Sequence, residues 1–281
     1  MGSRVKSEVV RPWRLIVDGP ASGSRNQAID QALADVAEWR GGTGILRLYR
    51  WSPACVSLGR HQPLALLDRE AIQQRGWEIV RRPTGGGAIL HINELTYCLI
   101  APVGHPLLSA GVVESAAQIG NCLRTGLGLV GIAVECQQSG QPNAGRSQIC
   151  FAQAAAGELS WRGVKLVGSA QWRRSRYLLQ HGSLPLDQEH GRLGEVLMVT
   201  ATQPVGLAGL SDASTRELDL AELIAAIARG FELVLGIGLV PSQLDSREAQ
   251  RATELQASVY SRCTELGLTR EEIEWQTSIW H

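Results

Sequence analysis

The sequence lacks several features that mark whole classes of protein. No run of about 18 consecutive apolar residues is present, so no membrane-spanning helix is expected. Residues 1–14 are polar and lack the apolar stretch of a secretory signal peptide. The 281 residues carry 27 basic and 27 acidic side chains, and this balance argues against nucleic acid as the main ligand. We therefore expect a cytoplasmic protein that binds neither membranes nor nucleic acids.

Closely spaced cysteines are also missing. No two of the six cysteines form a C-x-x-C pair, which argues against a zinc site and against the disulfide framework of a small secreted domain. We expect reduced thiols and no bound metal. The six are Cys55, Cys98, Cys122, Cys136, Cys150 and Cys263.

Lysine is scarce. Only two of the 27 basic residues are lysines, Lys6 and Lys165, and the other 25 are arginines. Lys6 falls in residues 1–11, a polar segment that we expect to be a mobile leader. Lys165 is then the only lysine of the expected folded body. This chain uses arginine for its ordinary surface cations, so a retained lysine points to a role that needs a compact amine with an adjustable pKa. Lys165 is therefore a candidate functional residue.

Hydrophobic periodicity and turn residues divide the chain into alternating helices and strands. Helices are predicted at 25–40, after Ser24, and at 65–75, 110–128, 218–234, 246–266 and from about 269. Strands are predicted at 12–19, 45–51, 54–60, 77–82, 88–91, 95–102 and 130–136, with a three-stranded meander over 158–184. Neighbouring strands joined by tight turns favour an α+β fold, with a mixed or antiparallel central sheet flanked by helices. Residues 12–245 should form one large domain and residues 246–281 a helical C-terminal extension.

A glycine-rich motif, RRPTGGGAILH, spans residues 81–91. Three consecutive glycines expose backbone N–H groups and let a ligand approach closely, and an arginine before them can bind a phosphate or a carbonyl oxygen. An isolated glycine triplet is more often a plain flexible turn, but the flanking arginines and histidine favour a binding role. The candidate binding residues are Arg82, Gly85, Gly86, Gly87, Ala88 and His91.

This motif and three other segments resemble, in order, the lipoate/biotin protein ligase superfamily. The segments are residues 13–33, residues 46–62, the glycine motif with ELTYCLIAP after it, and residues 150–187. The resemblance covers roughly residues 12–240. It implies the α+β fold of a biotin/lipoate protein ligase-like catalytic domain.

Two branches of that superfamily differ in chemistry. Ligases activate lipoate with ATP, whereas one group of acyltransferases takes octanoate from acyl carrier protein and holds it on the cysteine of a Cys-Phe pair, fifteen residues before a lysine. Here the pair is Cys150-Phe151 and the lysine is Lys165. GSAQ at 168–171 and LQHGS at 179–183 also resemble the acyltransferases. Gly87, however, stands where that branch commonly has arginine, and a third glycine is more typical of the ligases.

The acyltransferase resemblance implies octanoyl transfer from acyl carrier protein to a lysine of a lipoyl-carrying protein, such as glycine cleavage H protein or an E2 lipoyl domain. It implies no cofactor, and ATP only for the ligase alternative. A third possibility moves octanoate between two lipoyl-carrying proteins, and a fourth is a non-catalytic binding module of this fold. Further binding residues implied are Gly168, Ser169, Ala170 and His181.

Thiol chemistry supports Cys150 independently. A free thiol with a pKa of about 8.5 is only a few per cent thiolate at neutral pH, and the thiolate is the nucleophile. A nearby Lys165 ammonium would favour the charged sulfur, and could then hydrogen-bond the developing oxyanion or protonate the leaving thiolate. Cys150 follows a polar loop at 137–149, while the other five cysteines are typical of small buried apolar residues. His91 and His181 are expected to line or orient the pocket rather than shuttle protons.

Overall fold

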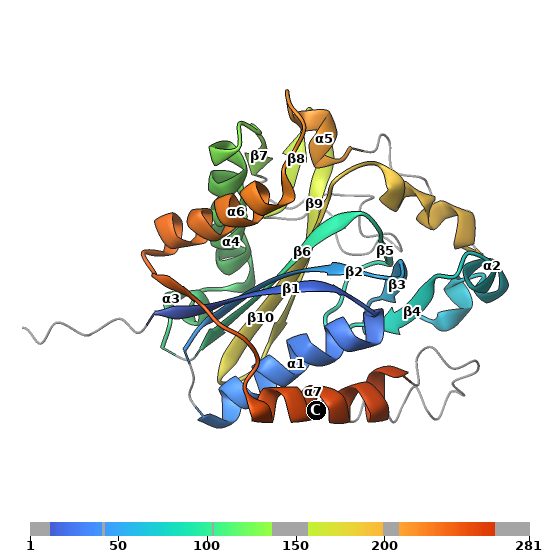
Figure 1. Ribbon diagram of the computed structural model, residues 1–281, viewed down its shortest axis with the longest axis horizontal. Coiled ribbons are helices and arrows are strands. Elements are labelled where there is room, and N and C mark those ends of the chain that lie inside the picture. The colour runs from blue at the N-terminus through green and yellow to red at the C-terminus, as the bar shows by residue number, and fades with distance from the viewer. Residues whose placement is uncertain (1–11, 41–42, 103, 137–156, 199–207, 262–281) are drawn as a thin grey trace, which may run out of the picture.

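An eight-stranded sheet forms the centre of the computed structural model, which describes residues 12–40, 43–102, 104–136, 157–198 and 208–261 (Figure 1). β1 pairs in parallel with β2 and β11, and the remaining neighbours pair antiparallel. The sheet is therefore mixed, and the predicted α+β class is confirmed. The strand order is β11 (Leu239–Pro241), β1 (Trp13–Ala21), β2 (Ile45–Trp51), β6 (Glu94–Pro102), β10 (Tyr177–Pro185), β9 (Val164–Arg173), β8 (Leu159–Trp161) and β7 (Glu135–Cys136).

A second sheet of three strands carries the glycine motif. β3 (Cys55–Leu58) lies between β4 (Glu78–Arg81), to which it is parallel, and β5 (Ile89–His91), to which it is antiparallel. The sequence predicts β2 and β3 as two strands joined by a Ser-Pro turn. Both strands form, but they lie in different sheets because β2 pairs with β1 and β6. The chain thus crosses from one sheet to the other between Trp51 and Cys55.

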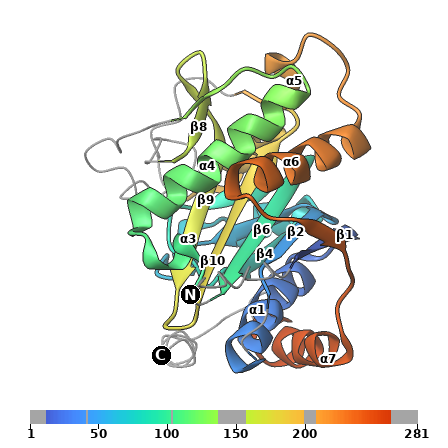
Figure 2. The ribbon, with the colours of Figure 1, turned by 90° about the vertical axis from the view of Figure 1, so that its left-hand side faces the viewer.

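Helices cover both faces of the large sheet, as Figure 2 shows. α1 (Gly23–Arg40) and α7 (Ser246–Leu255) pack together on one face, and α4 (Val112–Leu129) and α6 (Leu220–Leu235) on the other. The alternation of side chains along β6 explains this layering, since successive residues of a strand point to opposite faces. Tyr97 and Leu99 join the core under α4 and α6, whereas Cys98 and Ile100 join the core under α1.

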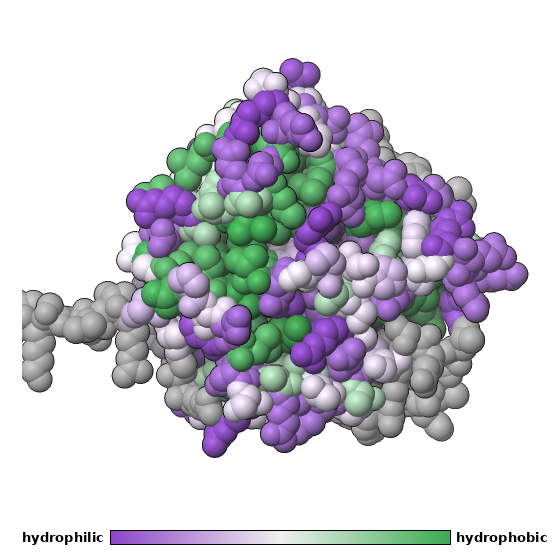
Figure 3. Space-filling model, viewed as in Figure 1, coloured by the Kyte–Doolittle hydropathy of each residue, from purple (hydrophilic) through white to green (hydrophobic). Residues whose placement is uncertain are grey.

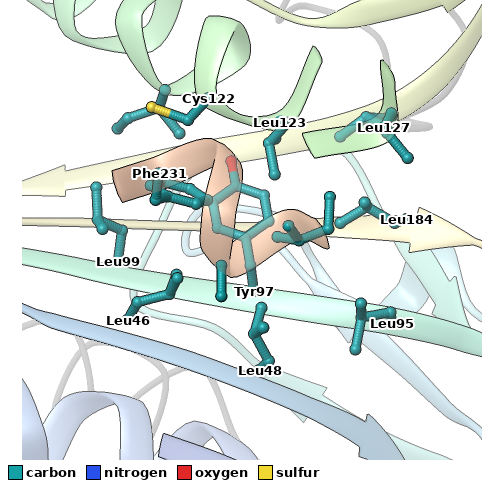
Figure 4. Packing of buried hydrophobic residues seen from close by; sticks show 14 of the residues in the cluster. Leu46, Leu48, Leu95, Tyr97, Leu99, Cys122, Leu123, Leu127, Leu184 and Phe231 are labelled. Atoms are coloured by element: carbon teal, nitrogen blue, oxygen red, sulfur yellow. The ribbon is translucent and has the colours of Figure 1, made fainter. Parts of the chain in front are cut away.

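The core beneath α4 and α6 is tightly closed. In Figure 4, Cys122, Leu123 and Leu127 of α4 face Phe231 of α6 and Tyr97 of β6. All five side chains are at most 2% exposed. The two helices approach closely at Gly230 of α6 and Gly126 of α4. Within the described residues, no helix is both long and apolar enough to cross a membrane.

Helix ends follow the local capping residues. α1 begins at Gly23, and Ser22 rather than Ser24 accepts a hydrogen bond from the Arg25 N–H. α7 begins at Ser246, where Asp245 accepts bonds from the N–H groups of Arg247 and Glu248. α7 continues as a π-helical turn at Gln256–Tyr260. The predicted leader at 1–11 and the helix from about 269 lie outside the described residues.

The expected C-terminal extension shares a core with the domain before it. Arg251 of α7 forms an ion pair with Asp35 of α1 at 2.8 Å, and the Tyr260 hydroxyl donates to Gln31. Four short elements were not predicted, because each depends on packing rather than on a long periodic pattern. They are β11, the 3-10 helix at Glu189–Val196, and helices α3 (Pro106–Ser109) and α5 (Leu210–Ala213). The helix predicted at 65–75 is divided into a 3-10 helix at Leu64–Leu66 and α2 (Arg69–Gln74).

β11 is one of the two edge strands of the large sheet. Figure 3 shows apolar side chains gathered on the face where α6 and β1 lie. The exposed apolar residues of these elements and of β11 include Val17, Leu233 and Val240, each 43–50% exposed. Pro241 in β11 has no backbone N–H, and a proline on an edge strand limits the addition of further strands.

Gly230→Ala should lower the stability of the protein, because a Cβ at this position would meet the Cys122 carbonyl at 2.3 Å and the Gly126 nitrogen at 2.5 Å. We expect a loss of about 1–3 kcal/mol from this overpacking, although alanine favours helix by about 1 kcal/mol over glycine. Urea unfolding measures the change. Gly128→Ala on α4 is the control, since nothing lies within 4 Å of its Cβ. A Gly230→Ala protein as stable as the wild type would contradict the packing.

Candidate active site

A pocket with an empty volume of about 340 Å³ opens where the large sheet meets the small one. β9 and β10 supply one wall, and Ile89 and the glycine-motif residues Arg82 and His91 supply another. Six predicted residues therefore come together, namely Arg82, His91, Gly168, Ser169, Ala170 and His181. Sequence reasoning missed seven further lining residues: Gln27, Tyr49, Trp51, Ile89, Thr96, Gly182 and Ser183.

Arg82 holds the glycine loop in place. Its Nη2 donates to the Gly85 carbonyl at 2.8 Å and to the Gly87 carbonyl at 2.7 Å, while Nη1 donates to the Ser57 carbonyl at 3.0 Å. Gly86 adopts φ +90°, a conformation that favours glycine. The guanidinium thus binds backbone carbonyl oxygens of the protein, and its predicted contact with a ligand stays a prediction.

The other residues of the glycine motif lie beside the pocket. Gly85, Gly86, Gly87 and Ala88 are not among the residues that line it. Ala88 is fully buried in a separate apolar cluster with Val56 and Leu58 of β3. The loop therefore shapes the pocket through Arg82.

Both ring nitrogens of His91 form hydrogen bonds. Nε2 lies 2.8 Å from the Ser57 hydroxyl, and Nδ1 lies 2.9 Å from Glu94 Oε1. Because a carboxylate only accepts, Nδ1 is the donor. The indole of Trp51 stacks on the imidazole with ring centroids 3.9 Å apart. These contacts hold the ring in one orientation in the pocket wall.

His181 belongs to a buried polar chain that reaches α1. Nε2 lies 2.8 Å from the Thr84 hydroxyl, and Nδ1 lies 3.5 Å from Asp30 Oδ2. Asp30 also accepts from Arg47 Nη1 at 2.7 Å and from the Tyr49 hydroxyl at 2.8 Å. Burial lowers the pKa of His181, although Asp30 opposes the shift. Burial acts to raise the pKa of Asp30, but Arg47 and His181 outweigh it and hold that pKa below its usual range.

Asp30 and Arg47 were not identified from the sequence. A signal was present, since Arg47 interrupts the apolar strand ILRLYRW and Asp30 lies among the apolar positions of the first helix. Charged residues in such settings are seldom buried unless they are paired. Both are indeed 0% exposed and paired with each other.

Lys165 is buried on β9 and forms an ion pair. Its Nζ lies 2.7 Å from Glu158 Oε2, and the two side chains are 6% and 4% exposed. The other carboxylate oxygen of Glu158 accepts from the Ser169 N–H at 3.2 Å. Lys165 does not line the pocket itself, but Glu158 links it to a residue that does. Sequence reasoning missed Glu158, which precedes β8 in the segment GELSW.

The predicted nucleophile Cys150 lies outside the described residues. Its contact with Lys165 therefore stays a prediction, as does the catalytic role of the pair. Among residues that the structure does describe, no three His, Cys, Asp or Glu side chains are grouped to hold a metal ion. The expectation that the reaction needs no metal or cofactor likewise stays a prediction.

Comparison with known proteins gives concordant matches. Residues 22–232 match the family model for the lipoyl protein ligase A/B catalytic domain. The chain is 36% identical over 259 residues to octanoyltransferase LipM of Carboxydothermus hydrogenoformans, covering 89% of this chain and 96% of that protein. It is 30% identical over 262 residues to octanoyltransferase LipM of Staphylococcus aureus, covering 86% and 94%.

Solved structures agree on the fold. A putative lipoate protein ligase from T. acidophilum with bound lipoic acid superposes with a TM-score of 0.75 at 21% identity, covering 89% of this chain and 97% of that one. A lipoate-protein ligase A bound with ATP superposes with a TM-score of 0.77 at 21% identity, covering 95% and 100%. At this identity the likeness shows the shared fold.

Acid should destabilise the protein in part through His181. A histidine whose pKa is lowered on folding binds fewer protons in the native state than in the unfolded chain. Its contribution to the free energy of unfolding is then fully present above the ordinary pKa of 6.5 and is lost as the pH drops below that value. For one group the loss is up to about 1.4 kcal/mol per pH unit. Burial also lowers the pKa of His105 and His190.

His181→Gln should therefore make the loss of stability between about pH 7 and about pH 5 shallower, even if the variant is less stable throughout. Urea unfolding across this range measures the slope. His61→Gln is the control, because His61 is exposed. An unchanged slope in His181→Gln would contradict the assignment.

Proposed function

The chain belongs to the lipoyl protein ligase A/B catalytic domain family, and we propose that it moves an octanoyl group from acyl carrier protein to a lipoyl-domain lysine through a thioester on Cys150. It is an acyltransferase that acts in protein lipoylation, since octanoyltransferases at 30–36% identity span most of its length. Acyl carrier protein as donor and the Cys150 thioester are the proposed parts.

The position of Lys165 is the observation that carries this proposal. Lys165 is the only lysine among the described residues, is 8% exposed, and precedes the pocket-lining residues Gly168, Ser169 and Ala170 on the same strand. A strand rises about 3.3 Å per residue, so the Cα atom of Lys165 lies roughly 10 Å along β9 from that of Gly168. Glu158 links the Lys165 ammonium to Ser169 in the pocket wall. An ammonium linked to the pocket wall in this way can serve the carbonyl of a bound acyl group.

The first step forms the acyl-enzyme. The Cys150 sulfur attacks the carbonyl carbon of the octanoyl thioester, a new C–S bond forms, and the C–S bond to the carrier breaks. The proton of the Cys150 thiol ends on the departing carrier thiolate. Lys165 donates a hydrogen bond to the developing oxyanion or delivers the proton to the leaving sulfur.

The second step forms the amide. An amine of the acceptor lysine attacks the acyl carbon, a C–N bond forms, the C–S bond to Cys150 breaks, and the amine proton returns to the sulfur. The incoming thioester is already activated, so neither ATP nor a metal is needed. We place the reaction in the cytoplasm, where thiols stay reduced.

The acceptor is a lipoyl-domain protein. Related proteins support this, since one of the structures with the same fold is described as a bipartite lipoate protein ligase with its E2 lipoyl domain from Thermoplasma acidophilum. Glycine cleavage H protein and an E2 lipoyl domain are the proposed acceptors for this chain.

An ATP-dependent lipoate or octanoate ligase is the second candidate. The glycine at position 87 favours it, because the acyltransferase branch commonly has arginine there. A ligase would release pyrophosphate with free octanoate and would not need Cys150. A third candidate, transfer between two lipoyl-carrying proteins, would accept an octanoylated lipoyl domain as donor.

The three donors can be compared in one transfer assay. Octanoyl-acyl carrier protein, octanoate with ATP, and an octanoylated H protein are each mixed with a lipoyl domain, and octanoyl-lysine is measured by mass spectrometry. The proposal predicts product with octanoyl-acyl carrier protein in the absence of ATP. Cys150→Ala should lose this activity by at least about 10³-fold, as expected when a covalent nucleophile is removed.

Two results would contradict the proposal. One is product from octanoate that depends on ATP and persists in Cys150→Ala, which supports the ligase. The other is product from the octanoylated H protein alone, which supports transfer between lipoyl-carrying proteins. Cys136→Ala is the matched control, because Cys136 is a partly buried cysteine outside the pocket.

A further inference from the structure

We propose that Glu158 is the positioning residue of this enzyme: it holds the Lys165 ammonium at the pocket and sets the rate of acyl transfer through that lysine. The inference rests on the proposed function, because it concerns how Lys165 serves the acyl group. Glu158 itself is assigned no contact with substrate.

The geometry of Glu158 links two parts of the site. Oε2 lies 2.7 Å from Lys165 Nζ, and Oε1 accepts from the Ser169 N–H at 3.2 Å. Ser169 lines the pocket. One carboxylate therefore fixes the ammonium relative to the pocket wall, and a shift of either group is transmitted to the other.

An irregularity in β9 lies at the same place. Ser160 of β8 pairs with Lys165, and the preceding residue Leu159 pairs with Val167. One step along β8 thus corresponds to two steps along β9, which places an extra residue in β9 between Lys165 and Val167. Such bulges redirect the side chains beside them. Leu166 and Val167 both join the apolar core beneath α4 and α6, so the simple alternation of side chains is interrupted directly after Lys165.

Burial explains why the partner must be a carboxylate. Both side chains are almost wholly removed from water, and a buried ammonium without an opposite charge is strongly disfavoured. The Glu158 carboxylate faces Lys165 Nζ and fixes its direction, while the thiol chemistry needs a donor near the reacting sulfur. Removing the negative charge should change the chemical step more than substrate binding.

Glu158→Gln tests the role with little change of shape. The amide oxygen can still accept from the Ser169 N–H, but the charge that faces Lys165 is lost. We expect kcat for transfer from octanoyl-acyl carrier protein to fall roughly 10- to 100-fold, less than the about 10²–10⁴-fold that a proton-transfer group itself contributes. KM for the carrier should stay unchanged, and Glu158→Asp should recover part of the rate.

Glu248→Gln is the matched control. Glu248 is also buried, with a side chain 3% exposed, and it pairs with Arg14 at the junction of β1 and α7. Loss of this ion pair should lower the melting temperature while kcat is retained. If Glu158 had only a structural role, Glu158→Gln would behave in the same way.

A double-mutant cycle measures whether Glu158 affects the rate through Lys165. In a Lys165→Met background, Glu158→Gln should cause no further loss of rate, because residues that act as a unit are not additive. Circular dichroism establishes that each variant is folded, and Glu158→Asp serves where Glu158→Gln does not fold.

The outcomes separate this inference from the proposed function. No transfer from octanoyl-acyl carrier protein by the wild type would overturn the proposed function. Wild-type transfer together with a normal kcat in Glu158→Gln, or with additive losses in the double variant, would overturn the role of Glu158 alone. Wild-type transfer with a reduced kcat, an unchanged KM and no added loss in the double variant supports both.

Discussion

Two fully buried charges, the guanidinium of Arg47 on β2 and the carboxylate of Asp30 on α1, meet at 2.7 Å in the middle of the fold. Removing one partner of such a pair leaves the other charge buried without a counter-charge or water, which lowers the free energy of unfolding by about 3–5 kcal/mol. Asp30 also holds Tyr49 and His181, and His181 contacts Thr84 before the glycine loop. The pocket therefore depends on this pair, because it ties α1, β2 and β10 to the small sheet.

The polar groups around the pocket are already engaged with the protein. Arg82 binds the carbonyls of the glycine loop, His91 bonds to Ser57 and Glu94, and His181 is buried with a lowered pKa that favours its neutral form. Such groups shape and orient the pocket, and in the proposed acyl transfer the Lys165 ammonium is the charged donor. The buried Lys165–Glu158 pair places that charge beside the pocket wall.

The long helices could be predicted from the sequence, because α4 and α6 each bury a regular apolar face and α1 carries apolar residues at helical spacing. β11 could not, since three residues pair with β1 only after more than two hundred intervening positions. In the site, the glycine motif and the family resemblance led to the pocket residues. Asp30 was missed because its partners Arg47 and His181 lie 17 and 151 positions away. Glu158 is close to Lys165 in sequence, but their contact depends on how β8 pairs with β9, which the spacing alone does not define.

The covalent intermediate is the central claim, and one measurement tests it most directly. The protein is mixed with octanoyl-acyl carrier protein without ATP or acceptor, and the acylated peptide is located by tandem mass spectrometry. The proposed mechanism predicts a single octanoyl group on Cys150 that is discharged when a lipoyl domain is added. An octanoyl group on any other residue, or none until octanoate and ATP are supplied, would contradict it.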